Sequence, residues 1–539
     1  MTQVRLWLFV CLMCLWGGSA LVPAVAQSSV LIQTLEDGER LHTIQPGETL
    51  YGLTRLYGVT AEAICAANPG LSAQNFKAGT VILIPKPAAE PAKTEEEPAQ
   101  EAASEKPVGI AGSNCREMHR VKSKETLFSI AQKYGVTLEE LRAANPETLQ
   151  PGYELKKKDV LCIPYHREPT KAVKVEEKAP SNEELFRQVR GEERGLSTIR
   201  VGVVLPLKEQ TPLAARTLDF YRGLLMAVDS MKHTGLNFEI YTFDAGTTAE
   251  DINRVLQRPI FPQLDIVFGP VDPTQIKAVS KVSEQWKIPM VVPFYSKSEE
   301  VFTNPYLFVL NAPDTIQYVE AERLFKASFQ GRNIVMVDTG EKTDGFVSYL
   351  KKDFPSLRYT KLPMDENTLI SRLDENKENV IVLSSADLKS LNIFMPVMRN
   401  VVQSRPELKL KLFGYPEWLT YSGSLVEDYC VADTYIYSSF FTDYASPAFT
   451  DFSNRFLKNF NTEMLRGTPR MGVYGYDCGL FFFKGLSRHG KNFSVQANEV
   501  QHLQHKFRMQ RVSTWGGMFN RTMQLVRYMP NHQIEIHQL

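Results

Sequence analysis

The chain has 539 residues, of which 43% are apolar and 23% charged, and its formal net charge is zero. This length exceeds what one hydrophobic core can use, and at about 150 residues per domain it predicts three or four folded units. The lack of a basic excess argues against nucleic acid as a partner.

The N-terminus has the pattern of an export signal. Arg5 supplies a positive charge, residues 6–16 form an apolar run, and residues 24–26 (Ala-Val-Ala) form a small-residue cleavage site. The run is shorter than the about 20 residues that span a membrane, and no later stretch is long and apolar enough. We therefore predict a signal peptide over residues 1–26 and an exported protein in the periplasm or envelope of a bacterium.

Two stretches repeat each other at a constant offset of 77 residues: His42–Pro69 and His119–Pro146. Each contains Glu-Thr-Leu, Tyr-Gly-Val-Thr and Ala-Ala-Asn-Pro in this order, which indicates a tandem of one small module. Thr60 and Thr137 fit helix N-caps, and the residue before each final proline resists the helical region. The pattern predicts strand, helix, helix, strand in each copy.

These modules are expected at residues 40–86 and 116–165, with two linkers beside them. Residues 87–115 are rich in Pro, Ala, Glu and Lys, and residues 166–197 are polar, so neither can bury a core. Each module is then expected on a tether. Two weak sites joined in this way gain effective concentration on a repeating polymer.

Residues 198–539 have a different sequence pattern. Apolar runs such as 199–205, 265–268 and 333–337 alternate with helical periodicity, as in parallel sheets covered on both faces. Their length favours two α/β lobes over one. The predicted fold class is therefore multidomain, with two small βααβ modules and a two-lobed α/β domain with parallel sheets.

Five cysteines follow the predicted signal peptide. Cys115 and Cys162 flank the second module, where a disulfide would suit so small a domain. Cys478 lies in an apolar helical run, which favours a buried thiol or a bridge to Cys430. Cys65 stands where the other module has an arginine, so we expect it to face solvent as the thiol left over.

Residues 41–85 and 118–164 resemble LysM domains through these repeated elements and a closing Ile-Pro. LysM domains bind N-acetylglucosamine polymers such as peptidoglycan or chitin in a shallow groove between the first strand–helix loop and the second helix–strand loop. Such loops offer backbone polar groups to the sugar, with leucine as an apolar floor. The resemblance assigns glycan binding to Gly47, Glu48, Thr49, Leu50, Pro69, Gly70 and Leu71, and to Lys124, Glu125, Thr126, Leu127, Pro146, Glu147 and Thr148.

The second module departs from the family pattern in its first loop. Lys124 replaces Gly47, and lysine adopts a positive φ less readily than glycine. Glycan binding is therefore expected more firmly of the first module.

The C-terminal domain resembles type 1 periplasmic substrate-binding proteins, the group of leucine/isoleucine/valine-binding proteins. The resemblance rests on residues 200–207, 267–270, 288–293 and 474–477. It implies a ligand cleft between the lobes, with contacts from Thr274, Tyr295, Ser296 and Glu417.

One loop departs from the amino-acid binders, where a serine-rich turn holds the ligand carboxylate. Here Asp272, Pro273 and Gln275 fit an N-cap, a first-turn proline and a capping box. The aspartate would occupy the free amides and repel a carboxylate. A neutral or cationic ligand is the remaining expectation for the cleft.

We find no catalytic pattern: no His-Glu-x-x-His, no Gly-x-Ser-x-Gly and no phosphate-binding glycine loop. His532 and His537 lack the spacing that would join them as metal ligands on a helix. We therefore expect no enzyme activity, cofactor or metal. The predicted function is a peptidoglycan-binding envelope protein whose C-terminal domain binds a small ligand or an envelope protein. The alternatives are a regulator of peptidoglycan synthesis acting by protein contact and, more weakly, a wall hydrolase.

Overall fold

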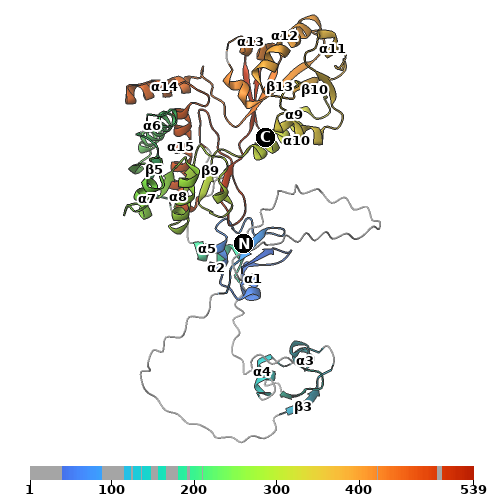
Figure 1. Ribbon diagram of the computed structural model, residues 1–539. Helices are drawn as coiled ribbons and strands as arrows, with labels where there is room; N and C mark the ends of the chain where they lie inside the picture. The colour runs from blue at the N-terminus through green and yellow to red at the C-terminus, as the bar shows by residue number, and fades with distance from the viewer. Residues whose placement is uncertain are drawn as a thin grey trace, which may run out of the picture. The chain divides into compact units, whose positions relative to one another are not determined.

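The computed structural model describes residues 39–87, 115–122, 125–134, 136, 138–146, 156–164, 180–190, 195–208, 210–421, 423–493 and 500–538 (Figure 1). The predicted signal peptide and nearly all of the first linker lie outside these residues. The chain forms two compact units: Met1–Pro87 with Ser181–Leu539, and Ala88–Pro180.

The first module has the predicted order of elements: β1 (Arg40–Thr43), α1 (Leu50–Tyr57), α2 (Ala61–Ala67) and β2 (Val81–Ile84). The two strands pair antiparallel. Thr49 and Thr60 are the N-caps of the two helices, and each side-chain oxygen accepts a backbone N–H of the first turn. Gly58 ends α1 at a φ of 64°, a conformation that costs glycine little.

A fifth element completes this module. Residues 182–190, within the segment predicted as a polar linker, form helix α5 (Asn182–Arg190). Its Phe186 is 5% exposed and packs with the core residues of the first module. The Phe186 ring meets the Phe76 ring edge to face, with centroids 6.1 Å apart. The module therefore reaches its full core only with chain that follows the second module in sequence.

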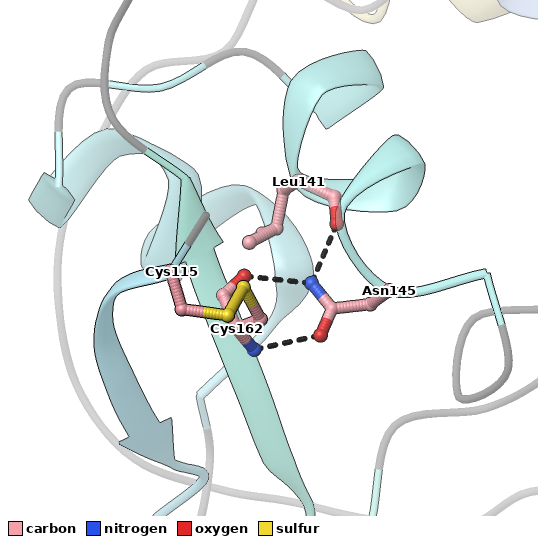
Figure 2. The surroundings of a disulfide bond; sticks show 4 residues. All are labelled: Cys115, Leu141, Asn145 and Cys162. Carbon is pink, nitrogen blue, oxygen red and sulfur yellow. Dashed lines mark hydrogen bonds between the residues drawn. A yellow bond between two sulfur atoms is a disulfide. The ribbon is translucent and has the colours of Figure 1, made fainter. Parts of the chain in front are cut away.

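The second module repeats the arrangement with β3 (Cys115–Arg120), α3 (Leu127–Tyr134), α4 (Leu138–Ala143) and β4 (Val160–Pro164). Its predicted disulfide, between Cys115 and Cys162, joins the two antiparallel strands (Figure 2). Beside it, Asn145 donates its side-chain amide to the carbonyls of Leu141 (2.7 Å) and Cys162 (2.8 Å). The Cys162 N–H donates back to Asn145 Oδ1 at 2.7 Å, so that Asn145 fastens α4 to β4.

The first lobe of the C-terminal domain is built on a seven-stranded sheet of order β15-β16-β9-β8-β7-β5-β6, parallel except for β15. Helices α6 and α15 pack on one face, and α7 and α8 pack on the other. The elements are β5 (Thr198–Leu205), α6 (Pro212–Lys232), β6 (Asn237–Asp244), α7 (Ala249–Leu256), η1 (Phe261–Gln263), β7 (Ile266–Phe268), α8 (Pro273–Gln285), β8 (Met290–Val292), η2 (Glu299–Phe302), β9 (Leu307–Val309), α14 (Pro447–Phe460), α15 (Met471–His489), η4 (Gly490–Asn492), β15 (Met509–Arg511) and β16 (Met518–Asn520).

The second lobe has its own seven-stranded sheet, of order β11-β10-β12-β13-β14-β17-β18. The first five strands are parallel, and β17 and β18 are antiparallel. The elements are α9 (Asp314–Phe329), β10 (Asn333–Asp338), α10 (Gly345–Asp353), β11 (Arg358–Lys361), α11 (Glu366–Ile370), β12 (Asn379–Leu383), α12 (Leu388–Ser404), β13 (Leu410–Gly414), η3 (Pro416–Thr420), α13 (Ser424–Val431), β14 (Thr434–Ser438), β17 (Gln524–Tyr528) and β18 (Ile534–His537).

The chain passes between the lobes three times, at residues 310–313, 439–446 and 521–523. Each lobe therefore contains segments from distant parts of the sequence. The predicted fold class, two βααβ modules and a two-lobed α/β domain with parallel sheets, is confirmed.

The Tyr-Gly-Tyr-Asp motif at residues 474–477 has a structural role. A Cβ on Gly475 would lie 1.9 Å from the Phe220 carbonyl oxygen, so glycine is what lets α15 approach α6 closely. Asp477 is buried and accepts the backbone N–H groups of Leu503, Gln504 and His505, each at 2.8 Å. The motif thus holds α15 and the segment after it in the first lobe.

The other cysteines differ from expectation. Cys430 and Cys478 are free buried thiols, so the alternative bridge between them does not form. Cys65 is also free, but it is 5% exposed and not solvent-facing as predicted. It lies in the same core cluster as Phe186 of α5. Because α5 is not part of the repeated sequence, the repeat alone could not indicate that Cys65 is buried.

The disulfide should carry much of the stability of the second module. Its 47-residue loop corresponds to roughly 4 kcal/mol of lost entropy in the unfolded chain. We expect reduction, or Cys162→Ser, to lower the free energy of opening of this module by about 2–5 kcal/mol. Hydrogen exchange of residues 127–134 with and without reductant measures this. Residues 50–57 of the first module serve as the internal control, and equal exchange of 127–134 in both conditions would contradict the prediction.

Candidate glycan-binding site

A partly buried chain of hydrogen bonds holds the first loop of the first module. His42 Nε2 lies 2.7 Å from Glu48 Oε2, and the Tyr57 hydroxyl lies 2.9 Å from His42 Nδ1. The same Glu48 oxygen accepts the Gln45 backbone N–H at 2.7 Å. Glu48, predicted to contact glycan, therefore uses this carboxylate oxygen to stabilise the loop that precedes α1.

The second module repeats this chain almost atom for atom. His119 Nε2 lies 2.8 Å from Glu125 Oε2, and His119 Nδ1 lies 2.9 Å from the Tyr134 hydroxyl. Glu125 also accepts the Lys122 N–H at 2.7 Å. Like Thr49 in the first module, Thr126 caps its helix, accepting the N–H of the residue three positions on at 3.1 Å.

Both carboxylates are stabilised in their charged form. The backbone N–H of Gln45 and then the His42 side chain lower the pKa of Glu48. The Lys122 N–H and then His119 lower the pKa of Glu125 in the same way.

The leucines predicted as an apolar floor are placed differently in the two modules. Leu50 and Leu71 are both 0% exposed and belong to the core of the first module. In this structure neither side chain presents surface to a ligand. Leu127, the counterpart of Leu50, is only partly buried.

The remaining predicted groove residues lie at the surface where they are described. Gly47 is exposed at a φ of 87°, as its turn requires, and Pro69 and Gly70 are half-buried. Pro146 is exposed. Lys124, Glu147 and Thr148 lie outside the described residues.

An asparagine in each module ties the second helix to the last strand, and the sequence analysis did not identify it. Asn68 is 0% exposed; its amide donates to the carbonyls of Ile64 (2.8 Å) and Leu83 (2.6 Å), and its Oδ1 accepts the Leu83 N–H at 2.8 Å. Asn145 does the same. The identity of His, Tyr and Asn at matching positions of the two repeats was the available signal for these roles.

In the C-terminal domain, Asp272 is the N-cap of α8 as predicted. Its Oδ1 accepts the N–H groups of Thr274 (2.8 Å) and Gln275 (3.2 Å). The expected capping box is not formed, because Gln275 instead donates its side chain to the Ala245 carbonyl at 2.8 Å. The amides that would hold a ligand carboxylate are therefore occupied by the chain's own aspartate.

The other predicted cleft residues are partly or fully accessible. Thr274 and Glu417 are exposed, and Tyr295 and Ser296 are half-buried. Although much of Glu417 is exposed, partial loss of solvent around its carboxyl, and then the charges of Asp344 and Asp314, raise the pKa of this group. This part of the second lobe is acidic, which disfavours an anionic ligand.

Within the described residues, no group of histidine, cysteine or acidic side chains could hold a metal ion. The described helices also include none with the length and apolar character needed to cross a membrane.

Residues 42–85 and 119–164 match the LysM domain family. Both modules are LysM domains. A secreted LysM effector, LysM1, of Trichophyton rubrum is 26% identical over 112 residues, which cover 20% of this chain and 44% of the relative. The chain thus matches less than half the length of that relative.

Solved structures similar to the C-terminal domain are type 1 periplasmic binding proteins and an LpoA protein. A branched-chain amino acid transporter protein of Rhodospirillum rubrum shows 14% identity and a TM-score of 0.45, covering 63% of this chain and 99% of that one. A substrate-binding protein of Desulfitobacterium hafniense shows 15% identity, the same coverage and a TM-score of 0.37. Haemophilus influenzae LpoA shows 10% identity and a TM-score of 0.43, covering 65% of this chain and 60% of that one.

The lowered pKa of Glu125 predicts acid sensitivity of the second module. A carboxyl whose folded pKa lies below its unfolded value contributes stability above the unfolded value, and this is lost as pH falls through the folded value. We expect protection of residues 127–134 from hydrogen exchange, corrected for intrinsic rates, to fall between about pH 5 and pH 3. Glu125→Gln should flatten this decline, whereas an unchanged decline in that variant would contradict the assignment.

Proposed function

We propose that the protein is a non-enzymatic envelope protein that binds peptidoglycan, or another N-acetylglucosamine polymer, through its LysM domains. The observation that carries this proposal is the pair of LysM domains, each with its first loop fixed by the histidine–glutamate–tyrosine chain. A loop shaped in advance loses little conformational entropy on binding, which favours affinity for a flexible polymer.

Binding of the LysM domains to glycan would hold the two-lobed domain beside the polymer. The first role of the two-lobed domain, in our proposal, is to bind a small ligand or a partner protein in the envelope. Export of the chain, predicted from residues 1–26, belongs to the same proposal, because peptidoglycan lies outside the cytoplasmic membrane.

A second candidate function is regulation of peptidoglycan synthesis by protein contact. It is favoured by the Asp272 cap, since the Thr274 and Gln275 amides already donate to Asp272. A domain whose carboxylate-binding amides are occupied is poorly suited to carrying amino acids. The same fold can instead offer its surface to another protein.

Retention of the full chain on purified sacculi tests glycan binding. We expect the wild type to sediment with sacculi and Thr126→Trp to reduce the affinity about tenfold or more, because the indole would fill the first loop of the second module. Thr126→Ser keeps the capping hydroxyl and should bind like the wild type. A wild-type chain that stays in solution would refute the proposal.

A thermal-shift screen of the full chain separates amino-acid transport from the other roles. We expect leucine, isoleucine and valine at millimolar concentration to leave the melting temperature of the two-lobed domain unchanged. A ligand at 100 times its Kd would add about 2.7 kcal/mol to the stability of the folded state. A shift of several degrees with any of the three would therefore contradict this expectation and would indicate that the domain binds amino acids.

A further inference from the structure

Helix α5 connects the two loops that border the predicted groove of the first LysM domain. At its N-terminal end, Asn182 Oδ1 accepts the Leu50 backbone N–H at 2.9 Å. At its C-terminal end, Arg190 donates to the Asn68 carbonyl oxygen at 3.2 Å. A nine-residue helix is about 13 Å long, so α5 extends from one wall of the groove to the other.

A helix cap and a buried phenylalanine hold α5 in this position. Ser181 and Glu184 form a reciprocal cap at its start: the Ser181 N–H donates to the Glu184 carboxylate at 2.8 Å, and the Glu184 N–H donates to the Ser181 hydroxyl at 3.2 Å. Phe186 enters the core of the LysM domain, and Arg190 lies over its ring at 5.9 Å. Figure 1 shows α5 beside α2, in agreement with the contacts between these helices.

The turn between β15 and β16 in the first lobe covers the second loop of the groove. The Gly70 N–H donates to the Thr514 carbonyl oxygen at 2.7 Å. The Thr514 hydroxyl lies 2.8 Å from Asn68 Oδ1 and 3.1 Å from the Val81 carbonyl oxygen. A Cβ at Gly70 would lie 2.2 Å from Arg511 Cδ, so this loop and the lobe are in tight contact.

The second LysM domain provides an internal comparison. Leu50 and its counterpart Leu127 occupy the same position of the repeat, yet Leu50 is fully buried and Leu127 is partly exposed. Pro69 is half-buried and its counterpart Pro146 is exposed. Among the described residues, the second domain has no helix in the place of α5. The difference in exposure between the two domains therefore follows the cover that α5 and the turn provide.

We infer that the groove of the first LysM domain is an interface within the chain, closed by α5 and the β15–β16 turn, so that glycan binding falls to the second domain. The inference rests on the proposed function, and it reverses the expectation that the first domain is the firmer binder. The Leu50 and Gly70 amides belong to the two loops that border the predicted groove, and both already have acceptors in the chain. A glycan could enter only by displacing the helix and the turn together.

Hydrogen exchange of the full chain tests the closed state directly. Asn182→Ala removes the acceptor of the Leu50 amide, and Thr514→Trp forces the turn away from Gly70. We expect the double variant to raise the exchange rates of these two amides at least tenfold, while Ile82 in β2 stays protected. Thr450→Trp, at an exposed position of α14, is the control for adding an indole to the domain and should change neither amide. Equal exchange in wild type and double variant would overturn the inference; Phe186→Ala offers a second route to opening if the double variant does not fold.

Sedimentation with purified sacculi supplies the second readout. If the groove is closed in the wild type, opening it adds a second site on the same chain. We expect an affinity gain of at least tenfold through effective concentration. An opened variant that binds sacculi no better than the wild type would overturn the assignment of a covered glycan site. If neither chain sediments, the proposed function fails, and the exchange rates still decide whether the groove is closed.

Discussion

One buried asparagine connects three parts of the first unit. Asn68 fastens α2 to β2 through its side-chain amide, its backbone carbonyl accepts Arg190 of α5, and its Oδ1 also accepts the Thr514 hydroxyl. Leaving the buried side chain of Asn68 unpaired would cost about 1–3 kcal/mol, which favours the pairing of α2 with β2. Arg190 and Thr514 add further hydrogen bonds to acceptors that the Leu71 and Leu83 N–H groups already satisfy. The fold of the LysM domain, the position of α5 and the contact with the first lobe therefore meet at this residue.

The two LysM domains have small hydrophobic cores, and each is stabilised by a different additional constraint. A two-stranded sheet with two short helices encloses too little apolar surface to be stable on its own, and a domain of this size needs an additional constraint. The second domain has the disulfide between Cys115 and Cys162. The first has no disulfide among its described residues; it has Phe186 of α5 in its core, and Cys65 is buried there as a free thiol. The two constraints differ in their effect on the surface: the disulfide adds no element over its domain, whereas α5 bonds to both loops that border the predicted groove of the first domain.

The sequence could predict what local chemistry determines. Thr60 and Asp272 are caps because a short side-chain oxygen is followed by a helical run, and the repeat itself indicated the βααβ order. The burial of Leu50 and Cys65 could not be predicted in this way, since it depends on α5, whose first residue is 132 positions after Leu50. That helix lies in a polar segment with one phenylalanine, and its hydrophobic partner is on another domain. Likewise, Gln275 had the right spacing for a capping box, yet the Ala245 carbonyl competes for it in the folded lobe.

Two helices of the two-lobed domain begin in a way that disfavours an anionic ligand. In such folds, ligands bind outside the carboxyl ends of the strands, where helix N-termini offer free amides to anions. Here α8 and α10 both begin with an aspartate: Asp272 accepts the Thr274 N–H, and Asp344 accepts the Phe346 N–H, each at 2.8 Å. An anionic ligand would have to displace a covalently tethered carboxylate, which is always present at high local concentration, and would meet its negative charge as well. These helix starts favour a neutral or cationic ligand, or a protein with basic groups, over an anionic ligand.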